Sequence, residues 1–293
     1  MRTQVLVLAA AAALGCAAAD LRFHPAQGGA FHFDTGVLKG TLRNEGRSTG
    51  LLPVTHVPTG TVMARSMGLF GIYRVFSDGR RYGNGMWSFP SEAELAGDGA
   101  VSVRWPPAED RPFRMQAVYR WAGPATLDIS ISVRPEQDLH GFEAFLAAYL
   151  GEQFTNSAVL AKGGRLLAAD RESGAWQMFP RGPEAVSLIR DGRWKLPPNP
   201  VDWVVRPEFE FPAAVRRDPA SGLAAVVLAP ARDCFAIATP QEGDSHYSLY
   251  FSLFGRDVTK GETARARARL VVLSSPDEEQ VRKLYRGYMR GTM

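Results

Sequence analysis

The chain has 293 residues and a formal net charge of +4 at pH 7, which is small for this length and gives no argument for nucleic-acid binding. Only five of its 34 basic residues are lysines. The excess of arginine either provides guanidinium groups that bind carboxylates or reflects a gene rich in G and C. A chain of this length needs no disulfide staples, and large β-folds reach this size as a single domain.

The first 19 residues have the pattern of a cleaved signal peptide. Arg2 supplies a positive start, residues 5–14 are apolar, and small residues at 17–19 precede Asp20 at the expected cleavage site. The apolar segment is far shorter than the roughly 20 residues that cross a bilayer, so no membrane span is expected. We therefore expect an exported protein, periplasmic or extracellular, with one mature domain over residues 20–293.

Lipoprotein processing is an alternative for this N-terminus, because Leu14, Gly15 and Cys16 resemble a lipidation site, although Ala13 matches it poorly. Cleavage after residue 19 instead leaves Cys234 as the sole cysteine and excludes an intramolecular disulfide. We expect Cys234 to be a buried, small apolar residue.

Alternation of apolar and polar residues, the pattern of a half-buried strand, dominates the chain after residue 20. It is clearest over residues 113–121 and 127–133, which predict a hairpin. Shorter candidate strands bounded by Gly, Pro, Asp or Asn are residues 37–42, 69–76, 101–105, 142–149, 185–189, 201–205, 209–215, 223–228 and 235–238. The segment 142–149 also fits the stripe of a helix. Together these segments predict an all-β fold, a large antiparallel β-sandwich or a barrel.

The last part of the chain predicts a second hairpin and one helix. Residues 246–253 and 265–273 alternate on either side of a turn at 255–262. A helix over 276–290 follows, with Ser274 or Ser275 as its cap, Pro276 in its first turn and acidic residues at 277–279. Its apolar stripe should dock on the sheet.

Several common enzyme signatures are missing. The sequence has no Gly-rich phosphate loop, no Gly-x-Ser-x-Gly elbow, no His-Glu-x-x-His and no Cys-x-x-Cys. The five histidines are too scattered to give metal-ligand spacing. We therefore expect neither a metal site nor another cofactor.

The remaining polar and aromatic residues suit a sugar, because a pyranose has C–H faces for aromatic stacking and hydroxyls for polar partners. Tyr73, Arg74, Arg81, Tyr82 and Trp87 form the densest cluster of this kind. The alternative is that the aromatic residues belong to the core and the arginines to a solvated rim.

Two further groups are candidates. His140 and Glu143 place an imidazole and a carboxylate close together in the sequence, as an acid–base pair would need. The alternative is a structural role, with a hydrogen-bonded histidine and a glutamate that is on the surface or in a salt bridge. His246 begins a strand on its polar face, which is either a concave sheet surface or plain solvent. His56 is a loop histidine.

Taken in order, the segments 71–76, 119–129, 141–145, 246–255 and 260–273 resemble the β-supersandwich proteins related to galactose mutarotase. The resemblance implies a supersandwich with a broad concave sheet that carries the site. In mutarotases a glutamate acts as base on the anomeric hydroxyl and a histidine as acid at the ring oxygen. His140, Glu143 and His246 are the right residue types, but their spacing does not reproduce a mutarotase signature.

The first functional hypothesis is a secreted carbohydrate-active enzyme with the candidate catalytic residues His140, Glu143, His246 and Tyr82. A lyase would use arginines to neutralise a uronate carboxylate and Tyr82 or His140 as base, whereas an epimerase would use Glu143 or Glu242 with a histidine. The candidate substrate-binding residues are His56, Arg74, Arg81, Trp87, Tyr119 and Trp203.

The alternatives are a non-catalytic sugar-binding protein, in which Trp87, Tyr119 and Trp203 stack on the ligand, and a structural envelope protein. The expected partner is a carbohydrate in the first two cases. The oligomeric state has no signature in the sequence.

Overall fold

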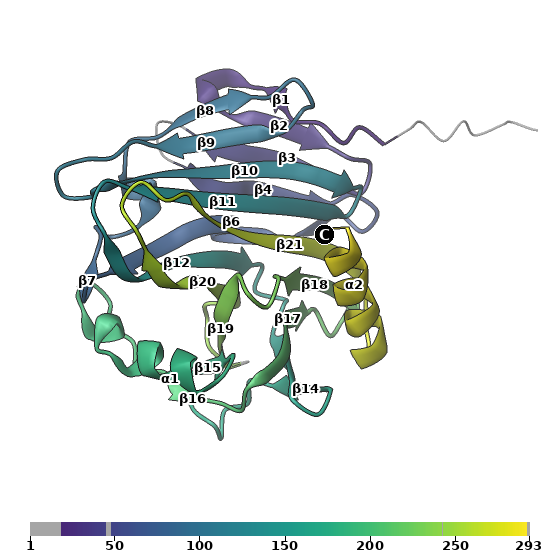
Figure 1. Cartoon of the computed structure of the whole chain (residues 1–293). Coiled ribbons are helices and arrows are strands. Elements are labelled where there is room, and N and C mark those ends of the chain that lie inside the picture. The colour runs from purple at the N-terminus through teal and green to yellow at the C-terminus, as the bar shows by residue number, and fades with distance from the viewer. Residues whose placement is uncertain (1–18, 45–47, 242, 292–293) are drawn as a thin grey trace, which may run out of the picture.

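Two large β-sheets pack face to face in the computed structural model, which describes residues 19–44, 48–241 and 243–291 (Figure 1). The proposed signal peptide lies almost entirely outside these residues. The predicted all-β sandwich with a C-terminal helix is confirmed.

The larger sheet is antiparallel except for one short parallel pair at its edge. Its strands in spatial order are β1 (His24–Pro25), β2 (Phe31–Asp34), β3 (Leu38–Asn44), β4 (Ser48–His56), β6 (Ala64–Ser77), β12 (Leu139–Leu150), β20 (Ser248–Val258), β19 (Cys234–Pro240), β15 (Trp176–Pro180) and β16 (Val204–Val205). Two short strands extend it, β5 (Thr61–Val62) on β4 and β7 (Arg80–Arg81) on β6.

The smaller sheet is antiparallel throughout its described strands. Its order is β14 (Arg165–Ala168), β13 (Asn156–Ala161), β17 (Phe209–Arg217), β18 (Leu223–Leu228), β21 (Ala264–Ser274), β11 (Thr126–Pro135), β10 (Phe113–Gly123), β9 (Val101–Trp105) and β8 (Glu92–Leu95). The predicted hairpin is confirmed as β10 and β11, in which Ala117 is paired with Ile131.

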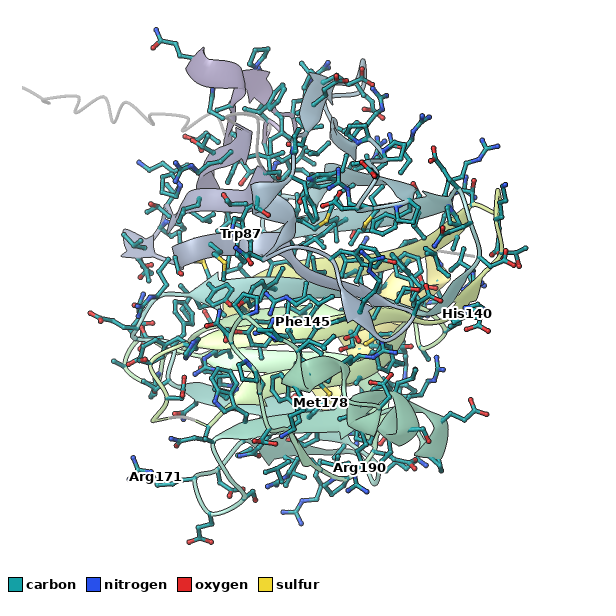
Figure 2. The ribbon with its side chains drawn as sticks, turned by 90° about the vertical axis from the view of Figure 1, so that its left-hand side faces the viewer. Trp87, His140, Phe145, Arg171, Met178 and Arg190 are labelled. Atoms are coloured by element: carbon teal, nitrogen blue, oxygen red, sulfur yellow. The ribbon has the colours of Figure 1, made fainter. Side chains whose placement is uncertain are left out.

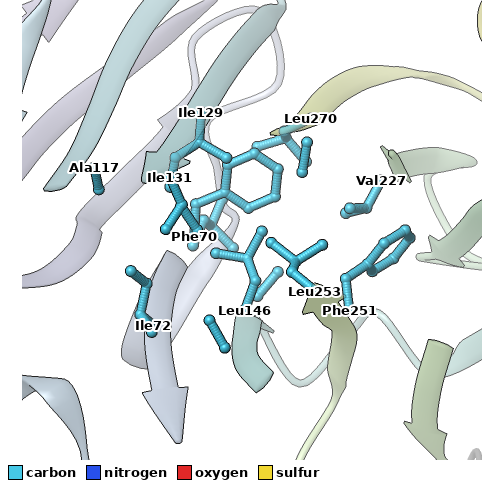
Figure 3. Packing of buried hydrophobic residues seen from close by; sticks show 14 of the residues in the cluster. Phe70, Ile72, Ala117, Ile129, Ile131, Leu146, Val227, Phe251, Leu253 and Leu270 are labelled. Atoms are coloured by element: carbon cyan, nitrogen blue, oxygen red, sulfur yellow. The ribbon is translucent and has the colours of Figure 1, made fainter. Parts of the chain in front are cut away.

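The main core lies between the sheets. Ile129, Ile131 and Leu270 of the smaller sheet meet Leu146 and Leu253 of the larger one (Figure 3). Each such side chain, fully withdrawn from water, contributes about 1.5–3 kcal/mol, so this layer is the main source of stability.

The described residues form two α-helices, α1 (Pro183–Arg190) and α2 (Glu278–Arg290), and three helices of one 3-10 turn at Gln27–Gly29, Met86–Ser88 and Arg193–Lys195. None of the helices in the described part of the chain is both long and apolar enough for a membrane span. Helix α2 confirms the predicted C-terminal helix, but its N-cap is Asp277 rather than Ser274 or Ser275. Asp277 and Gln280 form a reciprocal capping box.

The prediction of a strand over 185–189 is wrong, because these residues form α1. Pro183 lies at the first helical turn with Glu184 beside it, and Ala185 and Ile189, four residues apart, are the buried pair. The first helical position tolerates proline, and the i, i+4 spacing places both apolar side chains on the face that meets the larger sheet.

The second predicted hairpin is also wrong. Strand β20 pairs with β12 and β19 in the larger sheet, whereas β21 pairs with β11 and β18 in the smaller one. The connection between them therefore crosses from one sheet to the other. The strand itself begins at Ser248, because Tyr247 has a positive φ of 46° and His246 precedes it.

Candidate functional site

The outer face of the larger sheet, away from the smaller sheet, carries a second apolar cluster. In β12 the residues Ala144, Leu146 and Ala148 belong to the core between the sheets, while Phe145 and Tyr149 belong to this outer cluster. Both faces of the strand are thus covered, which explains its continuous apolar sequence and its ambiguous helical pattern. Figure 2 views the molecule from this side, with Phe145 between Trp87 and Met178.

A β-bulge in β6 directs two consecutive side chains to this outer face. Phe145 is paired with Arg74 and Leu146 with Ile72, so Tyr73 is the extra residue. Ile72 and Val75 belong to the core between the sheets, whereas Tyr73 and Arg74 both line the outer cavity. Bulges commonly re-aim side chains beside functional sites.

The cavity has a volume of about 440 Å³, which is within the range of small-molecule sites. Its floor comes from β6, β12, β15 and β20, and the segment 194–203 forms a wall. The lining residues are Tyr73, Arg74, Phe145, Tyr149, Trp176, Trp194, Asn199, Pro200, Val201, Trp203, His246 and Tyr250.

The rings of this cavity form a connected set. Phe145 stacks on Tyr250 at 4.7 Å, and Trp203 meets Trp176 at 5.7 Å and Trp194 at 5.3 Å, both edge to face. Trp176 and Trp203 are partly exposed, whereas Trp194 is buried. The cavity therefore offers apolar faces that are already held in place.

Two tyrosine hydroxyls meet at the floor. The Tyr250 hydroxyl donates to the Tyr149 hydroxyl at 3.0 Å. Burial raises the pKa of Tyr250 to about 12 and also raises the pKa of Tyr149. Both phenols therefore stay protonated near neutral pH and act as hydrogen-bonding groups rather than as bases.

Arg74 is the cation of the cavity. Its side chain is 3% exposed, its Nη2 donates to the Asn199 carbonyl at 2.9 Å, and its guanidinium lies 4.8 Å from the Tyr73 ring centre and 5.3 Å from that of Trp194. No Asp or Glu among the described residues lines the cavity. The cavity thus presents positive charge in an apolar frame.

His246 lies at the rim, and its Nδ1 is 2.6 Å from Asp244 Oδ1. Asp244 also accepts the His246 backbone N–H at 2.9 Å, and the imidazole packs edge to face against Trp176 at 4.7 Å. Asp244 therefore fixes the orientation of the ring, and a neutral ring that donates from Nδ1 keeps Nε2 as an acceptor.

Five of the predicted site residues gather in or beside this cavity. Arg74, Trp203 and His246 line it. Trp87 stacks on Tyr73 at 4.8 Å, and the Arg81 guanidinium lies 5.9 Å from the same ring and donates to the Pro198 carbonyl.

The other predicted residues lie elsewhere. Tyr82 and Tyr119 are buried in the core between the sheets, where Tyr119 donates to the Phe70 carbonyl at 2.8 Å. His56, at the end of β4, is 2.8 Å from the Thr59 hydroxyl. His140 is exposed, bound to Asp78 at 2.6 Å, and lies at the periphery of the face in Figure 2, away from Phe145.

Glu143 does not reach the cavity either. It is fully buried and its Oε2 accepts from Arg193 Nη1 at 2.9 Å, so it is the bridged glutamate of the alternative interpretation. Burial raises the pKa of Glu143, and the Arg193 charge opposes that shift. His140, Glu143 and His246 therefore do not converge in one cleft, and Glu242 lies outside the described residues.

Sequence reasoning missed Tyr149, Trp176, Trp194 and Tyr250 as cavity residues. One signal was available, since three tryptophans fall within residues 176–203 beside the segment Leu196-Pro197-Pro198-Asn199-Pro200. Another hollow of about 500 Å³, which includes Arg114, Arg134 and Lys260, has no aromatic lining. Within the described residues, no three His, Cys, Asp or Glu side chains gather as metal ligands do.

No protein-family profile matches the chain, and no curated protein matches its sequence. Among solved structures, a galactose mutarotase related enzyme from Lactobacillus acidophilus is similar over 85% of this chain and 98% of its own, with a TM-score of 0.50 and 12% identity. The chain has the galactose mutarotase-like fold.

A larger protein shares this fold. The ligand-free alpha-N-acetylgalactosaminidase from Bifidobacterium bifidum is similar over 93% of this chain but only 39% of its own length, with a TM-score of 0.51 and 11% identity. The predicted resemblance to the galactose mutarotase-like superfamily is therefore confirmed at the level of the fold. Structural similarity at identities this low establishes the fold. The activity has to be argued from the residues of the site.

Proposed function

We propose that the protein binds a saccharide in the aromatic cavity on the outer face of its larger sheet. The observation that carries the proposal is the grouping of Trp176, Trp203 and Tyr73 around one cavity with Arg74 at its floor. Aromatic faces suit the C–H faces of a pyranose, and the buried polar groups suit its hydroxyls. The fold supports this proposal, because a galactose mutarotase related enzyme and an alpha-N-acetylgalactosaminidase have a similar structure.

The test is a screen of the mature protein against plant, algal and host glycans by retention on the polymer, followed by calorimetry with the best oligosaccharide. Trp203→Ala removes a partly exposed ring of the cavity wall. We expect it to weaken binding roughly tenfold or more, because a tryptophan ring that the ligand covers contributes much of the binding energy at such contacts.

Phe211→Ala is the matched control, since Phe211 is a partly buried ring that stacks on Tyr285 at the far helix α2. It should leave the affinity unchanged. Equal affinities of the Trp203→Ala and wild-type proteins for every retained glycan would exclude this cavity as the binding site.

A second candidate function is catalysis by His246, favoured by its 2.6 Å hydrogen bond to Asp244 at the cavity rim. An oriented imidazole with Nε2 available can act as a general base or acid, as β-elimination or epimerisation requires. A lyase would release an unsaturated, ultraviolet-absorbing product that His246→Ala abolishes while binding persists. If the wild type is retained on a glycan but releases no unsaturated product, lyase activity is rejected and saccharide binding is still supported.

The place of action that fits this proposal is outside the cytoplasm, where polymeric glycans are met. The sequence of residues 1–19 supports export to the periplasm or the medium. A purely structural envelope role remains the alternative if no glycan binds.

A further inference from the structure

Arg74 differs from the buried Arg193 and Arg216 in how its nitrogens are satisfied. Its Nη2 donates to Asn199 and lies 3.4 Å from the Tyr73 hydroxyl, but its Nε and Nη1 are buried and have no hydrogen-bond partner among the residues that the structure describes. Burying a charged group without hydrogen-bond partners lowers the stability of the folded protein. Such a group in a native structure therefore points to a role other than stability.

Arg193 and Arg216 are buried as well, but hydrogen bonds satisfy all their nitrogens. Arg193 is bound to the carboxylates of Glu143 at 2.9 Å and Asp191 at 2.7 Å. Arg216 has no carboxylate partner within the described residues, but its three nitrogens donate to the carbonyls of Phe154, Thr155 and Ser248. The fold can therefore satisfy a buried guanidinium fully, and at Arg74 it does not.

The surroundings of Arg74 add positive rather than negative charge. Burial lowers the pKa of Arg81, and the nearby charge of Arg74 lowers it further, so the two cations repel each other across Tyr73. The carboxylate of Asp244 is bound to His246 at the rim. An anion in the cavity would relieve this repulsion.

We propose that the cavity selects an acidic saccharide and that Arg74 binds the carboxylate of a uronic acid residue. This inference rests on the proposed saccharide-binding function and names its ligand class. The guanidinium, held between the Tyr73 and Trp194 rings, has a fixed plane, and a planar fork of donors matches a carboxylate. The rings of Trp176 and Trp203 then take the apolar face of the sugar.

The experiment compares uronic acid trisaccharides (galacturonate, glucuronate and mannuronate) with their carboxyl-reduced, neutral forms by calorimetry on the mature protein. We expect at least one acidic form to bind wild-type protein about 10- to 100-fold more tightly than its reduced form, the value of a hydrogen-bonded charge pair. This comparison needs no variant and so does not depend on the folding of a mutant.

Arg74→Gln should then equalise the affinities for the acidic and reduced forms, and Arg74→Lys should restore part of the preference. Arg190→Gln, which removes an exposed guanidinium from α1, is the control and should leave the preference unchanged.

Equal affinity of the wild type for acidic and reduced forms, or an undiminished preference in Arg74→Gln, would overturn the inference and leave saccharide binding intact. Binding of neutral or sulfated saccharides alone would overturn it in the same way. Failure of every glycan in the screen to bind would instead reject the proposed function itself.

Discussion

At the scale of single residues, the same side-chain type serves different purposes in different places. The residue type of Glu143 suggested acid–base chemistry, yet its carboxylate is bound to Arg193 of the 3-10 turn at 193–195. Arg74 is also buried, but it lines a cavity and has no carboxylate partner in the described part of the chain. The partner, rather than the residue type, separates a structural charge from a binding one.

This view predicts a large stability effect at Glu143 without an effect on binding. Glu143→Ala leaves the Arg193 charge buried with only Asp191 as counter-ion, and we expect it to lower the free energy of unfolding by roughly 3 kcal/mol. Urea denaturation measures the loss. The double variant Glu143→Leu with Arg193→Met should recover much of it, and a Glu143→Ala protein as stable as the wild type would contradict the structural role.

Sequence reasoning reached some residues of the site and not others for a physical reason. Arg74, Trp203 and His246 stood out by chemical type, and all three line the cavity. Tyr82 and Tyr119 are of the same chemical type but lie in the core between the sheets. Alternation shows which residues of a strand share a face, but it does not show which of the two faces carries the site. The bulge that turns both Tyr73 and Arg74 outward breaks that alternation altogether.

At the scale of elements, local patterns predicted most strands but not their partners. The hairpin β10–β11 was predicted because its turn is short and one face is polar. Strands β20 and β21 have a similar pattern, yet they join different sheets, because Phe251 packs in the core while Tyr250 packs in the outer cluster. Burial on both faces of β20 is a tertiary property that a turn sequence does not encode.

Helix α2 offers a prediction at this scale. Its capping box uses the Asp277 side chain on the Gln280 backbone N–H at 2.7 Å. Asp277→Ala should lower the free energy of unfolding by about 1 kcal/mol, the usual loss for such a cap. Ser274→Ala is the control, because that serine is exposed and is not the cap, and a larger loss from Ser274→Ala in thermal denaturation would reject this assignment.

At the scale of the whole molecule, two sheets create two different faces. The face between them is the core, and the outer face of the larger sheet is free to carry the aromatic cavity, which α1 and the segment 194–203 flank (Figures 1 and 2). The all-β fold class could be predicted from the alternating segments, and the resemblance to galactose mutarotase-like proteins holds for the fold. The cavity depends on side chains from residues 73 to 250, brought together only by the folded sheet.

Export is a prediction at the scale of the whole molecule, and it has a direct check. Signal-peptide cleavage after residue 19 predicts a mature protein that begins at Asp20. The intact mass of protein recovered from the periplasm or medium shows at which residue the mature N-terminus lies. A lipid-modified N-terminus at Cys16, or an unprocessed chain, would contradict the cleavage prediction.

The most direct measurement of the central claim is a crystal structure of the mature protein with the tightest-binding saccharide from the screen. We predict a sugar ring against Trp176 or Trp203, with its carboxylate at Arg74. A saccharide bound at another surface, such as the hollow at Arg114 and Arg134, with the aromatic cavity left empty, would contradict the account.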